Sequence, residues 1–216
     1  MLRNAAFKDA LVFHAVFFAI AMPVALLLKG QALGMALIVL VLAYNAALPL
    51  AGIARKHADW PRLWLFLLPL SLTLPCADWM LVERMGTLVF PDHGIPRLGG
   101  VVPVYFMGLW IMLLWMVLWF AQLTRWPYIT TIVLSFAGFV FWEWAARPMA
   151  LWHAVGVAQI AGFALYPLIP EVLLCLGALY FWRLLQNKPI YHQVLAALSL
   201  TVFYAGALAL ALLWIG

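Results

Sequence analysis

The stretch VVPVYFMGLWIMLLWMVLWFAQL, residues 101–123, contains no charged side chain and shows no regular alternation of apolar with polar residues. An apolar run of about 20 residues is long enough to cross the hydrocarbon core of a bilayer as a helix. Because that core offers no water to backbone groups, a spanning segment is either a helix or part of a closed barrel, and barrel strands alternate. The stretch therefore predicts a transmembrane helix.

The rest of the chain has the same character. Of its 216 residues, 69% are hydrophobic and 9% are charged, which lies far outside the composition of soluble globular domains. No linker is long enough to separate two domains, so we expect one integral-membrane domain over residues 1–216, of the all-α class and built as a polytopic helical bundle. Cys76 and Cys175 form no CxxC motif and are expected to be buried, inert packing residues.

Seven apolar runs can be placed as membrane spans, and the sixth has two interpretations. The other six cover about residues 11–28, 32–53, 63–81, 101–123, 128–144 and 194–214. Residues 149–183 form either one long, tilted helix that is kinked by prolines and preceded by a short interfacial piece, or two short helices hinged at residues 166–170, which would make eight spans. The polar segment GTLVFPDHGIPRLGG, residues 86–100, is rich in Gly and Pro and is expected to be an ordered loop or a lid.

The net charge of +5 is carried by basic residues between the apolar runs, where they indicate topology rather than a nucleic-acid partner. Seven spans with the N-terminus inside put eight basic residues inside and four outside, whereas eight spans lose this bias. The inner set is Arg3, Lys8, Arg55, Lys56, Arg62, Arg125, Arg183 and Lys188, and the outer set is Lys29, Arg84, Arg97 and Arg147. We expect a protein of the bacterial cytoplasmic membrane, surrounded by membrane lipids.

Three carboxyl groups within the apolar runs are the candidates for chemistry. Ionisable side chains are costly at membrane depth and tend to mark function. Asp78 has no basic residue at helical spacing, Glu143 lies near the end of the fifth run, and Glu171 follows Pro170 near the expected middle of the sixth. Because burial favours the neutral form of a carboxyl group, such residues can act as proton donors. We expect Asp78, Glu143 and Glu171 to be catalytic.

Each carboxyl group also has a structural interpretation. Glu143 and Arg147 are four residues apart and could form an ion pair on one helix face. Glu171 could be a neutral, hydrogen-bonded link between helices. Glu83, next to Arg84, could simply end a helix at the lipid headgroups.

Aromatic side chains gather around these acids. Many of the 12 tryptophans belong at the membrane interfaces, but Trp79, Trp142 and Trp152 adjoin acidic positions, where ring faces can stabilise a cation. Packing against neighbours is the alternative role. The expected substrate-binding residues are Trp79, Glu83, Trp142, Trp152, His153 and Tyr166.

Several chemistries lack a sequence signal. The five histidines are far apart and form no HxxxH or HExxH motif, so we expect no metal site. The chain contains no P-loop, no dinucleotide-binding fingerprint and no GxSxG motif, so we expect no cofactor.

Three local patterns stand out within residues 78–185: Gly100-Val101-Val102-Pro103 before a Trp-rich span, Trp142-Glu143 followed by Pro148-Met149 and Trp152, and the proline–acid pattern of residues 166–171. These patterns resemble those of the integral-membrane carotenoid-biosynthesis proteins, which include carotenoid hydratases and lycopene cyclase-type enzymes. The chain departs from the pattern of the hydratases, with Glu143 in place of aspartate and Arg147 in place of a second acid. The small membrane terpene cyclases are similar in their number of helices, their few intramembrane acids and their many aromatic residues.

This resemblance implies acid-initiated chemistry on an isoprenoid. We therefore expect a cofactor-independent cyclase or hydratase that protonates an alkene or epoxide of an isoprenoid or polyene lipid. The alternatives are a small proton-coupled transporter and a non-catalytic subunit of a membrane assembly, in which the buried acids would pair with basic groups.

Overall fold

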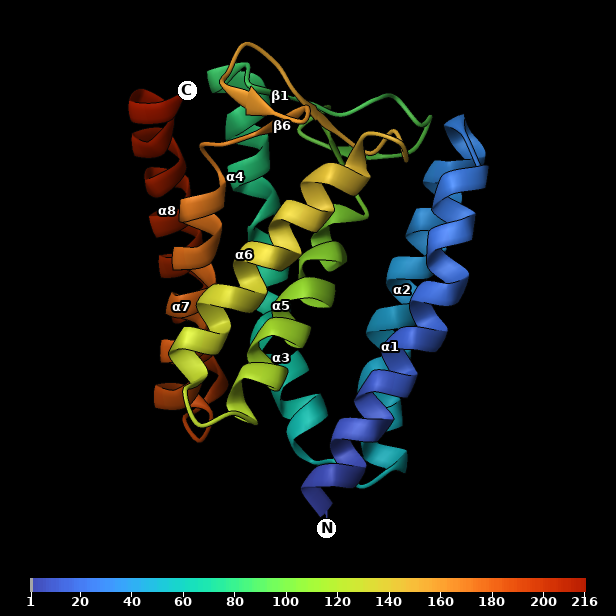
Figure 1. The fold of residues 1–216 in the computed structure, drawn as a ribbon, viewed down its shortest axis with the longest axis vertical. Coiled ribbons are helices and arrows are strands. Elements are labelled where there is room, and N and C mark those ends of the chain that lie inside the picture. The colour runs from blue at the N-terminus through green and yellow to red at the C-terminus, as the bar shows by residue number, and fades with distance from the viewer. Residues whose placement is uncertain (1) are drawn as a thin grey trace.

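A computed structural model describes residues 2–216 of the chain, with side chains from Ala5 onward, and forms a bundle of long helices (Figure 1). The helices are α1 (Leu2–Leu27), α2 (Gly30–Ala54), α3 (Asp59–Thr73), α4 (Pro75–Met80), α5 (Phe106–Gln122), α6 (Pro127–Ala146), α7 (Leu168–Leu185) and α8 (Ile190–Ile215). The π-helical turn η1 (Leu81–Met85) continues α3 and α4 into one rod, Asp59–Met85. The described chain thus has seven helical rods, which confirms the expected membrane bundle and its helix count.

The two ends of the bundle differ in how the helices are connected. Short turns join α2 to α3, α5 to α6 and α7 to α8 at the end that holds the N-terminus, which we call the basal end (Figure 1). Residues 86–105 and 147–167 form two long loops at the opposite, apical end, where the C-terminus also lies. Three antiparallel pairs brace these loops: β1 (Leu88–Val89) with β4 (His153–Ala154), β2 (Arg97–Leu98) with β3 (Val102–Pro103), and β5 (Gln159–Ile160) with β6 (Phe163–Ala164).

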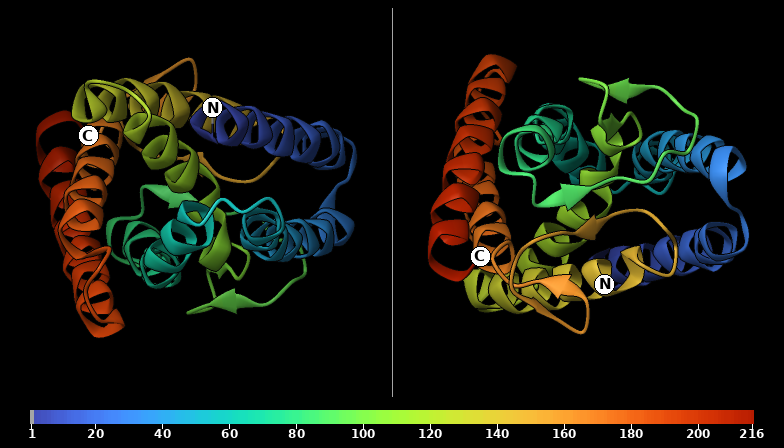
Figure 2. Two further views of the ribbon diagram at one scale, coloured as in Figure 1. Left: turned by 90° about the horizontal axis from the view of Figure 1, so that it is seen from below. Right: turned by 90° about the horizontal axis from the view of Figure 1, so that it is seen from above.

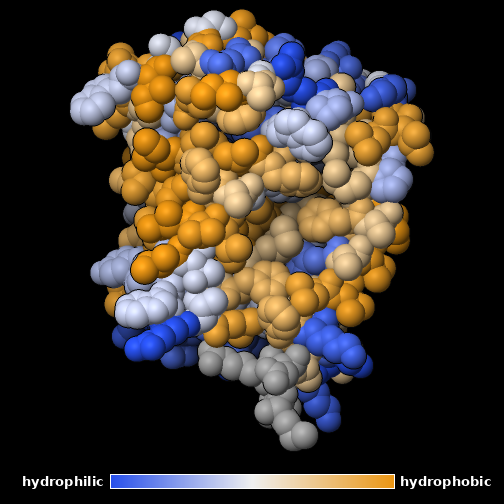
Figure 3. Space-filling view, in the orientation of Figure 1, coloured by the Kyte–Doolittle hydropathy of each residue, from blue (hydrophilic) through white to orange (hydrophobic). Residues whose placement is uncertain are grey.

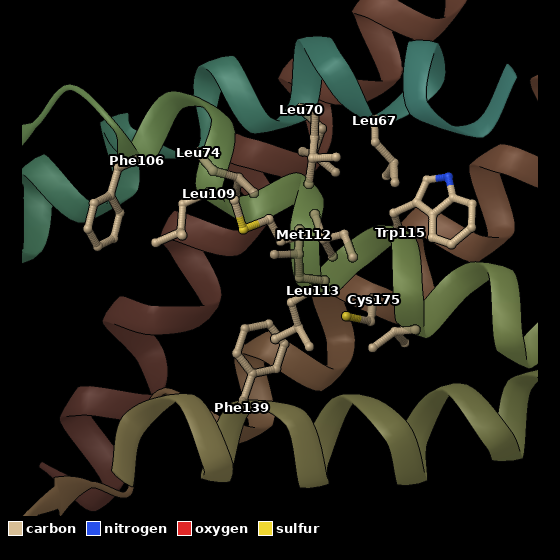
Figure 4. Packing of buried hydrophobic residues seen from close by; sticks show 14 of the residues in the cluster. Leu67, Leu70, Leu74, Phe106, Leu109, Met112, Leu113, Trp115, Phe139 and Cys175 are labelled. Atoms are coloured by element: carbon tan, nitrogen blue, oxygen red, sulfur yellow. The ribbon is translucent and has the colours of Figure 1, made fainter. Parts of the chain in front are cut away.

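Helix α5 lies inside the bundle and contacts α2, α3, α6 and α7, as the views along the bundle show (Figure 2). Leu67 and Leu70 of α3 point toward it from one side and Phe139 of α6 from the other (Figure 4). Since α5 is enclosed by other helices, its apolar residues fill the core. Trp115, for example, is fully buried.

The outer surface between the two ends is apolar. Hydrophobic residues dominate the middle of the visible face, and hydrophilic residues gather at both ends (Figure 3). Six rods are long and apolar enough to cross a membrane, and α5 is a shorter apolar helix. Large side chains such as Leu27 and Leu213 are about 80% exposed, at 79% and 81%. Because water would penalise so much exposed apolar surface, the chain is a membrane protein.

Residues 149–183 contain one helix, as the seven-span interpretation expected, and not two. The expected start of that helix is wrong, because α7 begins only at Leu168 and residues 147–167 are a loop. The reason is local: Gly156 and Gly162 have positive φ angles of 66° and 86°, which a helix does not allow. Ala161 and Gly162 form a two-residue turn between β5 and β6, with both φ angles positive as in a type I′ hairpin.

Two smaller expectations also need correction. The apolar stretch 101–123 becomes helical only at Phe106, since Val102 and Pro103 belong to β3. Cys175 is buried as expected, but Cys76 is exposed on the bundle surface.

Candidate acidic pocket

Three helices bring their acidic side chains to one cavity near the apical end, which we call the acidic pocket. Asp78 of α4, Glu143 of α6 and Glu171 of α7 all line it. Its volume is about 70 Å³. A water molecule needs roughly 10–15 Å³ by this measure, so the pocket has room for a few waters or for a small part of a larger ligand.

Asp78 lies in the short helix α4, directly before a change from α-helical to π-helical geometry. Pro75 occupies the first turn of α4, and the π-helical turn η1 follows and ends at Gly86, whose φ angle is 64°. π-Helical turns widen a helix locally and are frequent at functional sites. The Asp78 carboxyl is 5% exposed, and its Oδ2 accepts a hydrogen bond from the Trp110 Nε1 of α5 at 3.2 Å.

Glu143 lies one turn before the end of α6 and is oriented by a tryptophan from the following loop. The Trp152 Nε1 donates a hydrogen bond to Glu143 Oε1 at 2.9 Å. The Trp152 ring also stacks on Trp142, with ring centroids 6.2 Å apart. The proposed ion pair with Arg147 is absent from the described residues, and Arg147 is exposed beside Gly162.

Glu171 is in the first turn of α7 rather than in the middle of a helix, because that helix starts at Leu168. Glu171 therefore lies at the same membrane depth as the apical ends of α4 and α6, close to the other two acids. It is 4% exposed, and its Oε2 has no hydrogen-bond partner. A buried polar atom without a partner is costly, so its retention points to a role beyond packing.

Hydroxyl groups from the apical loops complete the polar lining. The hydroxyls of Thr87 and Tyr166 are 2.9 Å apart and form a hydrogen bond, and Tyr204 of α8 lies across the pocket. Burial raises the pKa of Tyr166 to about 12, so its phenol stays neutral at physiological pH. No Lys, Arg or His lines this pocket. The three carboxyl groups therefore face one another without a protein cation among the described residues to balance them.

A larger apolar cavity adjoins the acidic pocket, and we call it the apolar groove. It has a volume of about 580 Å³ and lies among α1, α2, α5 and α6. Leu109, Leu113 and Trp142 line both spaces. A ligand could therefore place a reactive end among the carboxyl groups while its hydrocarbon remains in the groove.

Six of the nine expected site residues line the acidic pocket: Asp78, Glu143, Glu171, Trp142, Trp152 and Tyr166. The other three lie elsewhere. Trp79 packs against Gly99 and lies beneath the Arg84 guanidinium, 5.4 Å from the ring centroid. Glu83 is exposed, and His153 is exposed in β4. Trp79 follows Asp78 on the same helix, and its side chain leaves the helix about 100° away from that of Asp78.

Several pocket residues carry little signal in the sequence. Trp110 appeared only as one of several tryptophans along an apolar run, and Thr87 as part of a polar loop. Tyr204 lies in an apolar run without charge, whereas Phe139 lies one helical turn before Glu143 on α6. The i+4 spacing could therefore have found Phe139, but no such spacing could find Trp110 or Tyr204, because α5 and α8 contain no acid.

A model of a protein family described as a domain of unknown function, DUF6989, matches residues 75–215. This range includes all three acids of the pocket and leaves out α1, α2 and α3. Searches of the curated proteins and of the solved structures found no match. Since the family model covers well over half of the chain, the protein belongs to the DUF6989 family.

Proposed function

We propose that this protein is a membrane-embedded, cofactor-independent acid–base enzyme, a cyclase or hydratase of an isoprenoid or polyene lipid. The observation that carries the proposal is the pairing of a small pocket with three carboxyl groups and an apolar groove with which it shares a wall. Ligand sites of several hundred Å³ lined mainly by apolar residues, with a few convergent polar groups, are typical of enzymes.

The hydrogen bonds suggest how the roles are divided. Trp110 and Trp152 donate to Asp78 and Glu143, and such bonds stabilise a carboxylate. Glu171 has an oxygen without a donor, so it is the group best placed to be a neutral acid. We assign Glu171 as the proton donor, with Glu143 as the alternative donor and Asp78 as the second acid or base.

The proposed reaction needs only these groups and, for hydration, water. The Glu171 carboxyl transfers its proton to an alkene carbon or to an epoxide oxygen, which leaves a carbocation and a Glu171 carboxylate. The ring faces of Trp110, Trp142 and Trp152 stabilise the cation. In a cyclase, a second alkene attacks the cation and a carboxylate removes a proton. In a hydratase, water adds and loses its proton to a carboxylate, so the proton balance closes in both cases.

Transport across the membrane is less well supported. The space between the acidic pocket and the basal end is filled by fully buried apolar side chains, including Leu70, Leu114 and Leu174. A proton path would have to pass through this layer. The third candidate, a subunit of an assembly, would pair its acids with a partner's basic groups.

We extend the proposal to orientation and location. The basal end carries most of the basic residues at the helix ends, and the positive-inside rule places such an end in the cytoplasm. The proposal therefore puts the N-terminus inside and the acidic pocket near the outer face of a bacterial cytoplasmic membrane.

The test is to express the chain in a host supplied with linear isoprenoids or carotenoids and to examine the lipid extract by mass spectrometry. We expect a product that has either gained water or kept the substrate mass. Glu171→Gln should lower its yield by about 100-fold or more, the size of a general-acid contribution. Glu83→Gln, which changes an exposed acid of the same end, should leave the yield unchanged.

The proposal fails if Glu171→Gln, Glu143→Gln and Asp78→Asn each leave product formation unchanged in correctly inserted protein. Accumulation of a solute that depends on a pH gradient, with no product, would instead identify a transporter.

A further inference from the structure

A second polar cavity lies at the basal end, far from the acidic pocket, and we call it the basal pocket. It has a volume of about 570 Å³. The turn between α2 and α3 forms one wall, and the basal parts of α3, α5 and α7 form the others. The reaction proposed for the acidic pocket does not involve the basal pocket. The polar lining of the basal pocket distinguishes it from the apolar groove.

The basal pocket has two cations that form no ion pair. Lys56 and Arg183 both line it, as does Asp59, and neither cation is paired with Asp59 or with another acid among the described residues. The two cations outnumber the one carboxylate of the lining. The nearby Asp9 carboxylate is already engaged, because Arg55 lies 2.9 Å and His57 lies 2.8 Å from its oxygens. Lys56 also has a φ of 60°, a conformation that is strained for a residue other than glycine.

A buried donor without a partner lies in the same wall. Trp60 is 1% exposed, lines the basal pocket, and its Nε1 has no hydrogen-bond acceptor. Trp115 and Trp119 pack edge-on against its ring and fix its position. A donor held in this way, in a lining that also includes Lys56 and Arg183, is complementary to a ligand that brings negatively charged oxygens.

We propose that the basal pocket binds a phosphate-bearing group. A guanidinium and an ammonium suit phosphate oxygens, and the indole N–H offers a third donor. Two sources share this chemistry: the headgroup of an anionic phospholipid in the leaflet around the basal end, and a soluble phosphate ester. The proposal is independent of catalysis in the acidic pocket.

The test measures binding to the purified full-length chain in detergent by native mass spectrometry and by titration. The probes are phosphatidylglycerol, diacylglycerol with the same acyl chains, and inorganic pyrophosphate. We expect phosphatidylglycerol to bind and diacylglycerol not to bind. Competition by pyrophosphate would assign the site to soluble phosphate esters, and its failure to compete would assign it to the lipid headgroup.

Three variants locate the site. Arg183→Gln should weaken binding about tenfold, as expected for one charge-assisted hydrogen bond. Trp60→Phe keeps an aromatic ring and removes the N–H, and should weaken binding severalfold. Arg125→Gln is the matched control: Arg125 and Arg183 each lie over an aromatic ring at the basal end, 5.3 Å and 5.5 Å from the centroids, but Arg125 does not line the pocket.

The proposal is overturned if no phosphate-bearing probe binds, or if Arg125→Gln weakens binding as much as Arg183→Gln. The latter result would mean that only the diffuse positive charge of the basal end attracts the anion. Thermal unfolding of each variant checks that it is folded. Arg183→Gln decides the question even if Trp60→Phe is unstable.

Discussion

The single residue with the clearest conflict between stability and chemistry is Glu171. Its carboxyl is almost completely buried, and one of its oxygens lacks a partner. Such a group destabilises the fold, whereas an apolar side chain of similar size would pack against its neighbours without this cost. Proteins tolerate conflicts of this kind mainly where function requires them.

Glu171→Leu should therefore stabilise the protein while it abolishes product formation. We expect the free energy of unfolding to rise by about 1 to 3 kcal/mol, the usual cost of one unsatisfied buried group. Thermal unfolding in detergent measures the change. Glu83→Leu is the control, because Glu83 is exposed and its replacement should have little effect. A loss of stability in Glu171→Leu would show that the carboxyl has a structural role.

At the same scale, the sequence could identify the acids but not all of their partners. Asp78, Glu143 and Glu171 stand out because charge is rare in apolar runs. Trp110 and Tyr204 do not stand out, since their membership of the pocket depends on how α5 and α8 are rotated. That rotation is set by packing between helices, which a single sequence does not reveal.

At the scale of elements, the hydropathy pattern wrongly predicted a helix in place of the loop before α7. Residues 149–167 are apolar enough to resemble a span, yet they form β4 and the β5–β6 hairpin. The signal that could have found the hairpin is the turn residue Gly162, because few other residues accept its φ of 86°. Hydrophobicity alone does not separate an apolar loop from a membrane helix.

Gly162→Ala should loosen the hairpin. An L-residue at a left-handed position costs about 1 to 2 kcal/mol, and the new methyl group would also meet the Arg147 side chain. If proteases cut the opened hairpin, cleavage within residues 155–165 should be about 5 to 30 times faster. Gly206→Ala in α8 is the control, since nothing lies near its added methyl group and its backbone is helical. Equal cleavage rates in both variants would contradict the strained turn.

For the molecule as a whole, the number of apolar runs predicted the number of helices. The order of the helices along the chain then predicted which connecting loops lie together at each end of the bundle. The membrane orientation is still a prediction, and accessible surface positions allow a direct test. Val155 is exposed in the apical loop and Lys188 is exposed in the basal turn between α7 and α8. A variant without the native cysteines, Cys76→Ser with Cys175→Ala, provides the background.

In intact cells, a maleimide that cannot cross the membrane should label Val155→Cys and not Lys188→Cys. Both should be labelled after the membrane is opened by detergent, which controls for expression. The opposite pattern would place the basal pocket outside and the acidic pocket at the cytoplasmic face. That result would reverse the orientation without changing the geometry of either pocket.

The position of the apolar groove, among helices that cross the bilayer, has a kinetic consequence. A hydrocarbon would reach it by lateral diffusion among the acyl chains and would never need to dissolve in water. Turnover would then follow the mole fraction of substrate among the lipids instead of its bulk concentration. Diluting a fixed amount of substrate with inert phospholipid should slow the reaction, whereas adding buffer should not.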